Sequence, residues 1–376
     1  MERTINRQAG VTLVELMISL LLGLLIAIGL ATLFSQNKRS FYQNEDLARM
    51  MEDGRFALQE LARDIGMAGF YAELASPAWQ VDSNLDGAPN CRRADAVTTN
   101  WANPGLRVGV QDDGVPVAAT PFSVSWTYAL FPRGLDGFSP EQGTLAVANN
   151  ATAANATAEF PCLASVANLQ ADSDVVYTKR VAGAPSNTLD GDRVYVARRG
   201  PATGVLALGS TITASIPKTA GDPLENDWEF QPKVYYVRNI PTDINLDGTT
   251  DLDVPTLCRM VLNPGPVFEE DCIAQGIERF QIEWGVDSDG DGDANAYVSA
   301  LDASLTNAAL PDPNEVVSAR IHVLARSIRP DPTYTNTKTY TFADLPAYTP
   351  DDAFYRRLFS TTVLVRNVQG MNSLAF

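Results

Sequence analysis

Alternating acidic residues around glycine mark a loop whose residue types suit metal binding. The loop reads DSDGDGDAN and places carboxylates at Asp287, Asp289, Asp291 and Asp293. A sharp turn at glycine that brings several hard oxygens together is what a calcium ion requires. An EF-hand loop would have a bidentate glutamate at its twelfth position, where this chain has Val298. Calcium bound here would therefore need further ligands.

Two other loops repeat this pattern less completely. DINLDGTTDLD contains Asp243, Asn245, Asp247 and Asp251, and DSNLDG contains Asp82, Asn84 and Asp86. Asp, Asn and Gly are also common in ordinary turns, because they tolerate left-handed backbone angles and bond their own main chain. Four acids within seven residues repel one another unless they are solvated or neutralised, which favours calcium most in the loop of Asp287. Both interpretations, calcium site and plain turn, remain open.

The cysteines indicate disulfide bonds rather than a metal or redox site. None of the four has C-x-x-C spacing, and an even number in an exported domain favours disulfides. Cys258 and Cys272 are close in sequence, so we pair them, and by elimination we pair Cys91 with Cys162. Closing a loop of about 15 residues stabilises the fold by on the order of 3 kcal/mol through the lost entropy of the unfolded chain.

Few features of the sequence suit an enzyme. The single histidine, His322, lies in SARIHVLARS, whose alternation predicts a half-buried strand. It leaves no multi-histidine metal site, and a serine or cysteine triad would depend on His322 alone. There is no phosphate loop or cofactor fingerprint. We therefore expect a protein that is not an enzyme. The net charge of −17 separately disfavours nucleic acid as the main partner.

A long apolar segment near the start of the chain carries one further acid. Residues 11–34 make 24 residues, which as a helix span about 36 Å and can cross a hydrocarbon core of roughly 30 Å. Arg3 and Arg7 precede the segment, so the positive-inside rule keeps the start of the chain in the cytoplasm and sends the rest outward. Glu15 lies inside this span, where an unpaired acid costs about 2.5 to 3.5 kcal/mol. It therefore needs a partner.

The stretch GVTLVEL, from Gly10 to Leu16, resembles the amino terminus of type IV prepilins and pseudopilins. The resemblance implies that a prepilin peptidase cuts between Gly10 and Val11 and methylates Val11. It also implies that Glu15 faces the terminal ammonium of a neighbouring subunit when helices pack into a filament. The family usually has phenylalanine where this chain has Val11, which keeps the site apolar. The alternative is an ordinary signal anchor with Glu15 near the membrane interface.

The rest of the chain predicts an α+β fold. Apolar residues beyond Phe34 keep a helical spacing at Leu47, Met50 or Met51, Leu58, Leu61 and Ile65. After about Tyr71, β-rich runs alternate with turn residues; the clearest are DVVYTKRV, DRVYVARR, KVYYVRNI, LCRMVL, RFQIEWGV, RIHVLARSI and TTVLVRNV. We expect a leader (1–10), a transmembrane or filament-core helix (11–34), its amphipathic continuation (35–70) and an antiparallel β-rich head (71–376) against which the helix packs.

Three segments are similar to one branch of this class, the PilW-type minor pilins. NEDLARMMEDGRFALQELARDIGMAGFY resembles the family's helix and its exit, FQIEWGVDSDGDGDANAY its strand and aspartate loop, and RRLFSTTVLVRN its terminal strand. The resemblance implies a lollipop-shaped minor pilin that joins a type IV pilus or its priming tip. Its implied partners are other minor and major pilins, the prepilin peptidase and the inner-membrane assembly platform. The head would lie in the periplasm and later on the pilus at the cell surface.

Two alternatives stay open at this point. A pseudopilin of a type II secretion system shares every amino-terminal feature. A calcium-dependent adhesin would use the pilin stem only as its anchor. The three similar segments leave out residues 76–230, so a separate adhesive role there is compatible with the sequence.

Overall fold

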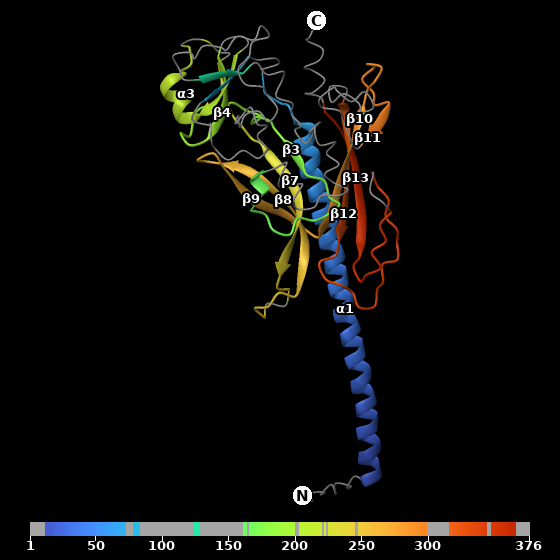
Figure 1. The fold of residues 1–376 in the computed structure, drawn as a ribbon. Helices are drawn as coiled ribbons and strands as arrows, with labels where there is room; N and C mark the ends of the chain where they lie inside the picture. The colour runs from blue at the N-terminus through green and yellow to red at the C-terminus, as the bar shows by residue number, and fades with distance from the viewer. Residues whose placement is uncertain are drawn as a thin grey trace, which may run out of the picture. The chain divides into compact units, whose positions relative to one another are not determined.

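The computed structural model describes residues 12–72, 78–82, 124–127, 161–163, 165–199, 203–219, 222, 225–244, 247–298, 316–343 and 347–365. A long apolar helix is followed by a β-rich head (Figure 1), as the sequence predicts. The chain divides into two compact units, residues 1–49 and residues 50–376. The helix α1 (Leu13–Gly66) contributes to both units.

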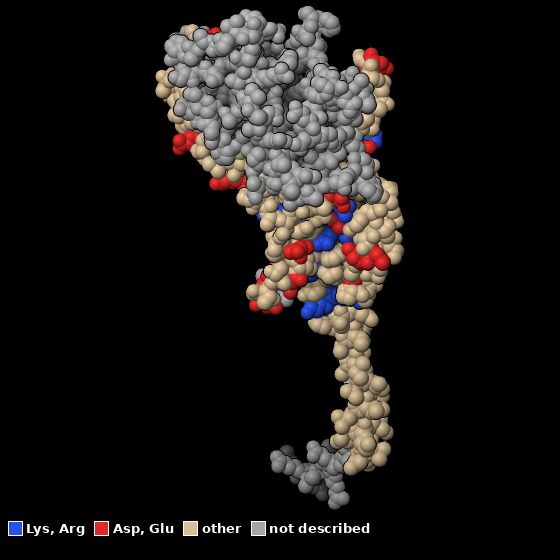
Figure 2. All heavy atoms as spheres, in the orientation of Figure 1, with Lys and Arg blue, Asp and Glu red and all other residues tan. Residues whose placement is uncertain are grey.

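In the first unit, α1 is an apolar helix with an exposed surface. Its large apolar side chains from Leu13 to Phe34 are all more than half exposed. Figure 2 shows this part of the helix without charged side chains over most of its visible face. The segment is long and apolar enough to cross a membrane. A helix that is apolar on all sides needs lipid or other helices around it.

The second unit contains three sheets among the described residues. Their orders are β2-β1-β5-β4-β6, β3-β7-β8-β9 and β11-β10-β12-β13. The strands are β1 (Ala78–Asp82), β2 (Val124–Thr127), β3 (Val176–Thr178), β4 (Val194–Arg199), β5 (Thr203–Leu208), β6 (Asp227–Glu229), β7 (Lys233–Thr242), β8 (Leu252–Asn263), β9 (Val267–Gln275), β10 (Ile277–Val286), β11 (Ala296–Val298), β12 (Val316–Arg326) and β13 (Arg356–Leu364). A short helix, α3 (Gly209–Ser215), follows β5. Neighbouring strands are antiparallel except β1 and β5, which are parallel.

From Met50 onward, α1 buries one stripe of residues within the head. The stripe consists of Met50, Gly54, Ala57, Leu61, Asp64 and Ile65. Leu47 and Leu58, which the periodicity also assigned to the stripe, are only half-buried. A Cβ atom on Gly54 would lie 2.3 Å from the Phe359 ring of β13. A glycine therefore interrupts the apolar pattern where the helix makes room for an aromatic ring.

Candidate functional site

Glu15, the predicted assembly residue, lies in the first turn of α1 and is exposed. Its backbone amide donates to Oγ1 of Thr12 at 3.3 Å. The order Thr-x-x-Glu is the sequence pattern of a capping box, of which the described residues form only the threonine half. An acid in the first turn also suits the helix dipole. The Glu15 carboxylate makes no hydrogen bond or ion pair within the described residues. The predicted processing residues, Gly10 and Val11, lie outside them.

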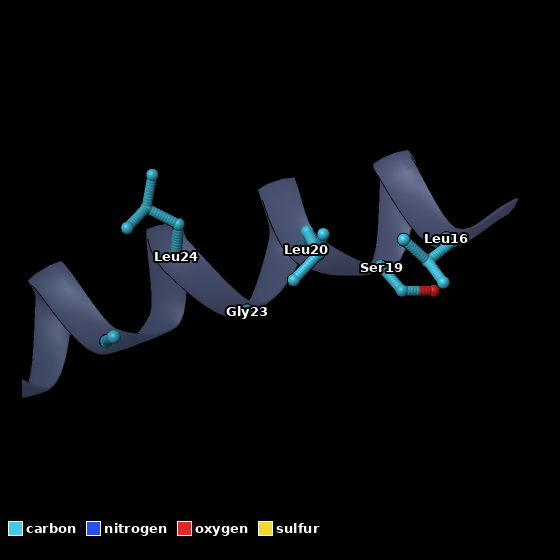
Figure 3. A pocket seen from close by; sticks show the side chains of 6 residues that line it. Leu16, Ser19, Leu20, Gly23 and Leu24 are labelled. Atoms are coloured by element: carbon cyan, nitrogen blue, oxygen red, sulfur yellow. The ribbon is translucent and has the colours of Figure 1, made fainter. Parts of the chain in front are cut away.

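A shallow groove runs along the same part of α1 (Figure 3). It is lined by Leu16, Ser19, Leu20, Gly23, Leu24 and Ala27. Ser19, Gly23 and Ala27 recur every four residues, and Glu15 precedes them in the same row. A Cβ atom on Gly23 would meet nothing within 4 Å. Rows of small residues are where membrane helices approach one another closely. This face therefore suits helix packing and has an acid at one end.

Asp64 is a buried acid that fastens α1 to the head. Its Oδ1 accepts a hydrogen bond from Nε of Arg180 at 3.1 Å. Its Oδ2 accepts from Nζ of Lys233 at 2.6 Å and from the Tyr235 hydroxyl at 2.5 Å. Burial alone raises the pKa of Asp64, but Lys233, Tyr235 and Arg180 outweigh burial and hold that pKa below its ordinary value. Since β7 supplies Lys233 and Tyr235, the acid joins the helix to that sheet.

Glu60 makes a second polar contact one turn earlier on α1. It accepts a hydrogen bond from Nη1 of Arg259 on β8 at 3.2 Å. Arg259 also binds Asp271 of β9, with Nη2 and Oδ2 2.8 Å apart. Apolar periodicity assigns only apolar residues to the contact face of α1 and does not indicate either acid. The available signal was the four-residue spacing of Glu60 and Asp64 within an otherwise apolar stripe.

The Asp287 side chain closes the acidic turn that follows β10. Its Oδ1 accepts hydrogen bonds from the amides of Gly290 at 2.6 Å and Asp289 at 3.3 Å. Its Oδ2 accepts from the amide of Gly292 at 2.7 Å. Partial burial raises the pKa of Asp287, but the amides of Gly292, Gly290 and Asp289 outweigh it and lower that pKa. Gly290 and Gly292 have φ angles of +78° and +92°, which glycine adopts readily.

The same loop brings acidic side chains together. Carboxylate oxygens of Asp287, Asp289 and Asp291 lie within 4.8 Å of one another, and Asp293 does not belong to this group. Hard oxygen donors at such spacing fit calcium. The amide bonds to Asp287 equally fit a turn that supports itself. Both interpretations therefore agree with the geometry.

The loop between β7 and β8 has the geometry of a turn. Oδ2 of Asp243 accepts from the amide of Gly248 at 2.7 Å, and Oδ2 of Asp251 accepts from the amide of Ile244 at 2.8 Å. In the described part of this loop, the carboxylates of Asp243, Asp247 and Asp251 do not gather into a close group of three. Asn245 lies outside the described residues, as do the Asp82 side chain, Asn84 and Asp86.

Comparison with protein families gives two matches. The family described as type IV pilus-assembly protein W (PilW) matches residues 234–367. The prokaryotic N-terminal methylation motif matches residues 5–31. The chain is a PilW-type type IV pilin. Comparison with curated proteins and with solved structures gave no match.

The two matched segments of this PilW-type pilin contain most of the features described above. Residues 5–31 include Glu15 and the groove. Residues 234–367 include most of β7 and all of β8 to β13, with the Asp287 loop. Residues 32–233, which include Asp64 and Arg180, lie outside both matches.

In the PilW-type head, a disulfide joins Cys258 of β8 to Cys272 of β9, the pair that the sequence favours. The two cysteines lie opposite each other in the strand register. Glu270 lies close to both sulfur atoms, but sulfurs bonded to each other offer no thiolate to a metal. Cys162 is also disulfide-bonded, and its predicted partner, Cys91, lies outside the described residues.

His322 of the PilW-type pilin lies between a serine and an acid on three adjacent strands. Its Nδ1 is 2.8 Å from Oγ of Ser360 on β13, and its Nε2 is 2.9 Å from Oε2 of Glu283 on β10. Serine hydrolases use the ring in the opposite sense, with serine at Nε2 and the acid at Nδ1. Glu283 also pairs with Arg320 at 3.5 Å. The row is therefore best described as polar cross-strand pairing. His322 lies in a strand, as predicted, and both of its ring nitrogens have partners.

Proposed function

We propose that this PilW-type pilin is a minor pilin, processed after Gly10 and assembled through α1 into a type IV pilus or its priming tip. The observation that carries the proposal is the groove on α1, which lies within the methylation-motif match and has Glu15 in the same row. The proposed partners are the prepilin peptidase, other minor and major pilins and the inner-membrane assembly platform. Before assembly the head would lie in the periplasm.

Cleavage after Gly10 would make Val11 the terminal residue, next to the helix cap at Thr12. The new ammonium would then lie about one helical turn from Glu15. Because no described residue bonds the Glu15 carboxylate, the ammonium of a neighbouring subunit can neutralise it. Buried charges of opposite sign are tolerated as a pair, whereas one alone is strongly unfavourable. The pairing therefore favours assembly.

A type II secretion pseudopilin is the second candidate, because its amino terminus would have the same features. The PilW match over residues 234–367 covers most of the carboxyl-terminal half of the head and favours the type IV pilus.

Filling the groove is expected to impair assembly. Gly23→Leu puts a large side chain where helices would approach, so we expect at least about a tenfold loss from sheared pili, equivalent to about 1.4 kcal/mol of packing. The measurement compares the amount of protein in the pilus and inner-membrane fractions by immunoblot.

Gly29→Leu is the matched control. It makes the same chemical change at a glycine that is also open within 4 Å but lies outside the groove. An equal loss of pilus incorporation in both variants would show that the effect belongs to the helix in general and would contradict a packing role for the groove.

We also propose that the loop of Asp287, Asp289, Asp291 and Asp293 binds calcium. The close group of three carboxylates in this loop supports the proposal.

Calcium at about 100 times its Kd should then stabilise the folded state by about 2.7 kcal/mol and raise Tm. Thermal unfolding of the full chain in detergent, with calcium and with a chelator, measures this. Asp291→Asn should remove the calcium response, while Asp243→Asn should keep it. An unchanged Tm in calcium and chelator would leave the loop a plain turn and remove support for a calcium-dependent adhesin.

A further inference from the structure

Beyond Phe34 the surface of α1 changes while the helix continues. Phe34, Phe41 and Tyr42 are 73%, 67% and 41% exposed. Together with Lys38 they recur at three- and four-residue spacing, which places them along one face of the helix. Lys38 Nζ lies 5.7 Å from the centre of the Tyr42 ring, and the Phe41 and Tyr42 rings are 6.1 Å apart. We call these four residues the aromatic stripe.

Neither water nor hydrocarbon suits the aromatic stripe. Its neighbours in residues 35–44, SQNKRSFYQN, are polar and include a second cation, Arg39, but no acid. The polar residues and cations disfavour the hydrocarbon core, and exposed aromatic rings disfavour water. The membrane interface accepts both, because aromatic rings lie at the level of the head groups and long cationic side chains reach the phosphates.

The position of the stripe along the helix agrees with the dimensions of a bilayer. From Thr12 to Phe34 the helix rises about 33 Å, close to a hydrocarbon core of about 30 Å. From Thr12 to Phe41 it rises about 44 Å, within the roughly 40 to 45 Å that include both head-group layers. If Thr12 lies at one surface, Phe41 and Tyr42 therefore reach the head groups of the other.

We infer that the aromatic stripe binds phospholipid head groups at the outer face of the inner membrane and sets the depth of the subunit before assembly. This inference rests on the membrane-inserted state in the proposed function. The chain has a net charge of −17, but no acid lies between Glu15 and Glu45, so the stripe meets lipid phosphate with local positive charge. Axial position and charge together favour lipid over a second protein helix.

Spin labels on the full chain in phosphatidylcholine vesicles test this inference. No described cysteine is free, so Ala27→Cys, Ser40→Cys and Ala48→Cys each introduce a specific site. We expect the label at 27 to be accessible to oxygen but not to a water-soluble nickel chelate, and the label at 48 to show the reverse. The label at 40 should have intermediate accessibility, as at head-group depth. Replacing the rings in the Ser40→Cys background, with Phe41→Ser and Tyr42→Ser, should raise its chelate accessibility to that of the label at 48.

The outcomes separate this inference from the proposed function. Gln43→Ser in the Ser40→Cys background is the matched control and should leave the depth unchanged. An aqueous label at 40 with a membrane-embedded label at 27 would overturn the head-group inference alone. An aqueous label at 27 would overturn the inserted state itself. Protection of the label at 40 only when other pilin subunits are present would assign the stripe to subunit packing and overturn lipid binding.

Discussion

Asp64→Ala is expected to lower the free energy of unfolding of the head by about 3 to 5 kcal/mol, the cost of leaving buried charges without a partner. Lys233 and Arg180 have side chains only 16% and 10% exposed, and Asp64 accepts hydrogen bonds from both. The Tyr235 hydroxyl also loses its acceptor. Urea unfolding of the full chain in detergent, followed by tryptophan fluorescence, measures the change.

Asp64→Asn separates the charge from the shape of the side chain. Because the folded-state pKa of Asp64 lies below its ordinary value of 3.8, its stabilisation is present above that value and disappears as pH falls through the folded pKa. The stability difference between wild type and Asp64→Asn should therefore stay constant near neutral pH and shrink below about pH 4. Glu52→Gln changes an exposed acid on the same helix and should alter stability by less than about 0.5 kcal/mol. If Asp64→Ala lowers the free energy of unfolding no more than Glu52→Gln does, the hydrogen bonds of Asp64 do not stabilise the packing of the helix in the head.

Glu15→Leu is expected to leave membrane insertion intact and nearly abolish incorporation into pili. Removing the acid spares about 2.5 to 3.5 kcal/mol on insertion. In the filament, the ammonium of a neighbouring subunit would then be buried without a partner, at about 3 to 5 kcal/mol. That range corresponds to a loss of incorporation of about a hundredfold or more. The ratio of protein in sheared pili to protein in the inner membrane measures the effect.

The helix cap needs its own control, because the backbone amide of Glu15 takes part in it. Thr12→Ala removes the hydroxyl that accepts the Glu15 amide and should cost about 1 kcal/mol of helix stability. We expect its effect on pilus incorporation to be much smaller than that of Glu15→Leu. Wild-type incorporation of Glu15→Leu would mean that the acid serves only the local helix start.

Local sequence patterns predicted the helix and many of the strands, but not how the strands pair into sheets. Apolar periodicity identified α1 and seven of the strands because those signals repeat within one segment. The strand β9 was missed because Glu269, Glu270 and Asp271 on an exposed strand hide the alternation. The division into three sheets and the parallel pair of β1 and β5 depend on residues distant in sequence. The antiparallel β-rich head that the sequence predicts is therefore confirmed, and its described residues form three sheets.

The candidate sites divide in the same way. Glu15 could be named as a candidate because a charge inside an apolar helix is unusual, and its role in assembly stays a prediction. Cys258 and Cys272 could be paired because they are close in sequence, and the structure confirms that disulfide. The role of Asp64 could not be predicted from the residues near it, because its partners Arg180 and Lys233 lie 116 and 169 residues away in sequence. No pattern near Gly54 indicates that a ring from β13 occupies the space beside it. The sequence therefore indicates sites whose residues lie close together in the chain. It does not indicate contacts between residues that only the fold brings together.

The intact mass of the protein, purified from cells with and without a prepilin peptidase, tests the central claim most directly. Processing at Gly10 predicts loss of residues 1–10 and gain of one methyl group on Val11, only when the peptidase is present. A full-length, unmethylated mass in both cell types would contradict a processed pilin subunit and would leave α1 as a membrane anchor.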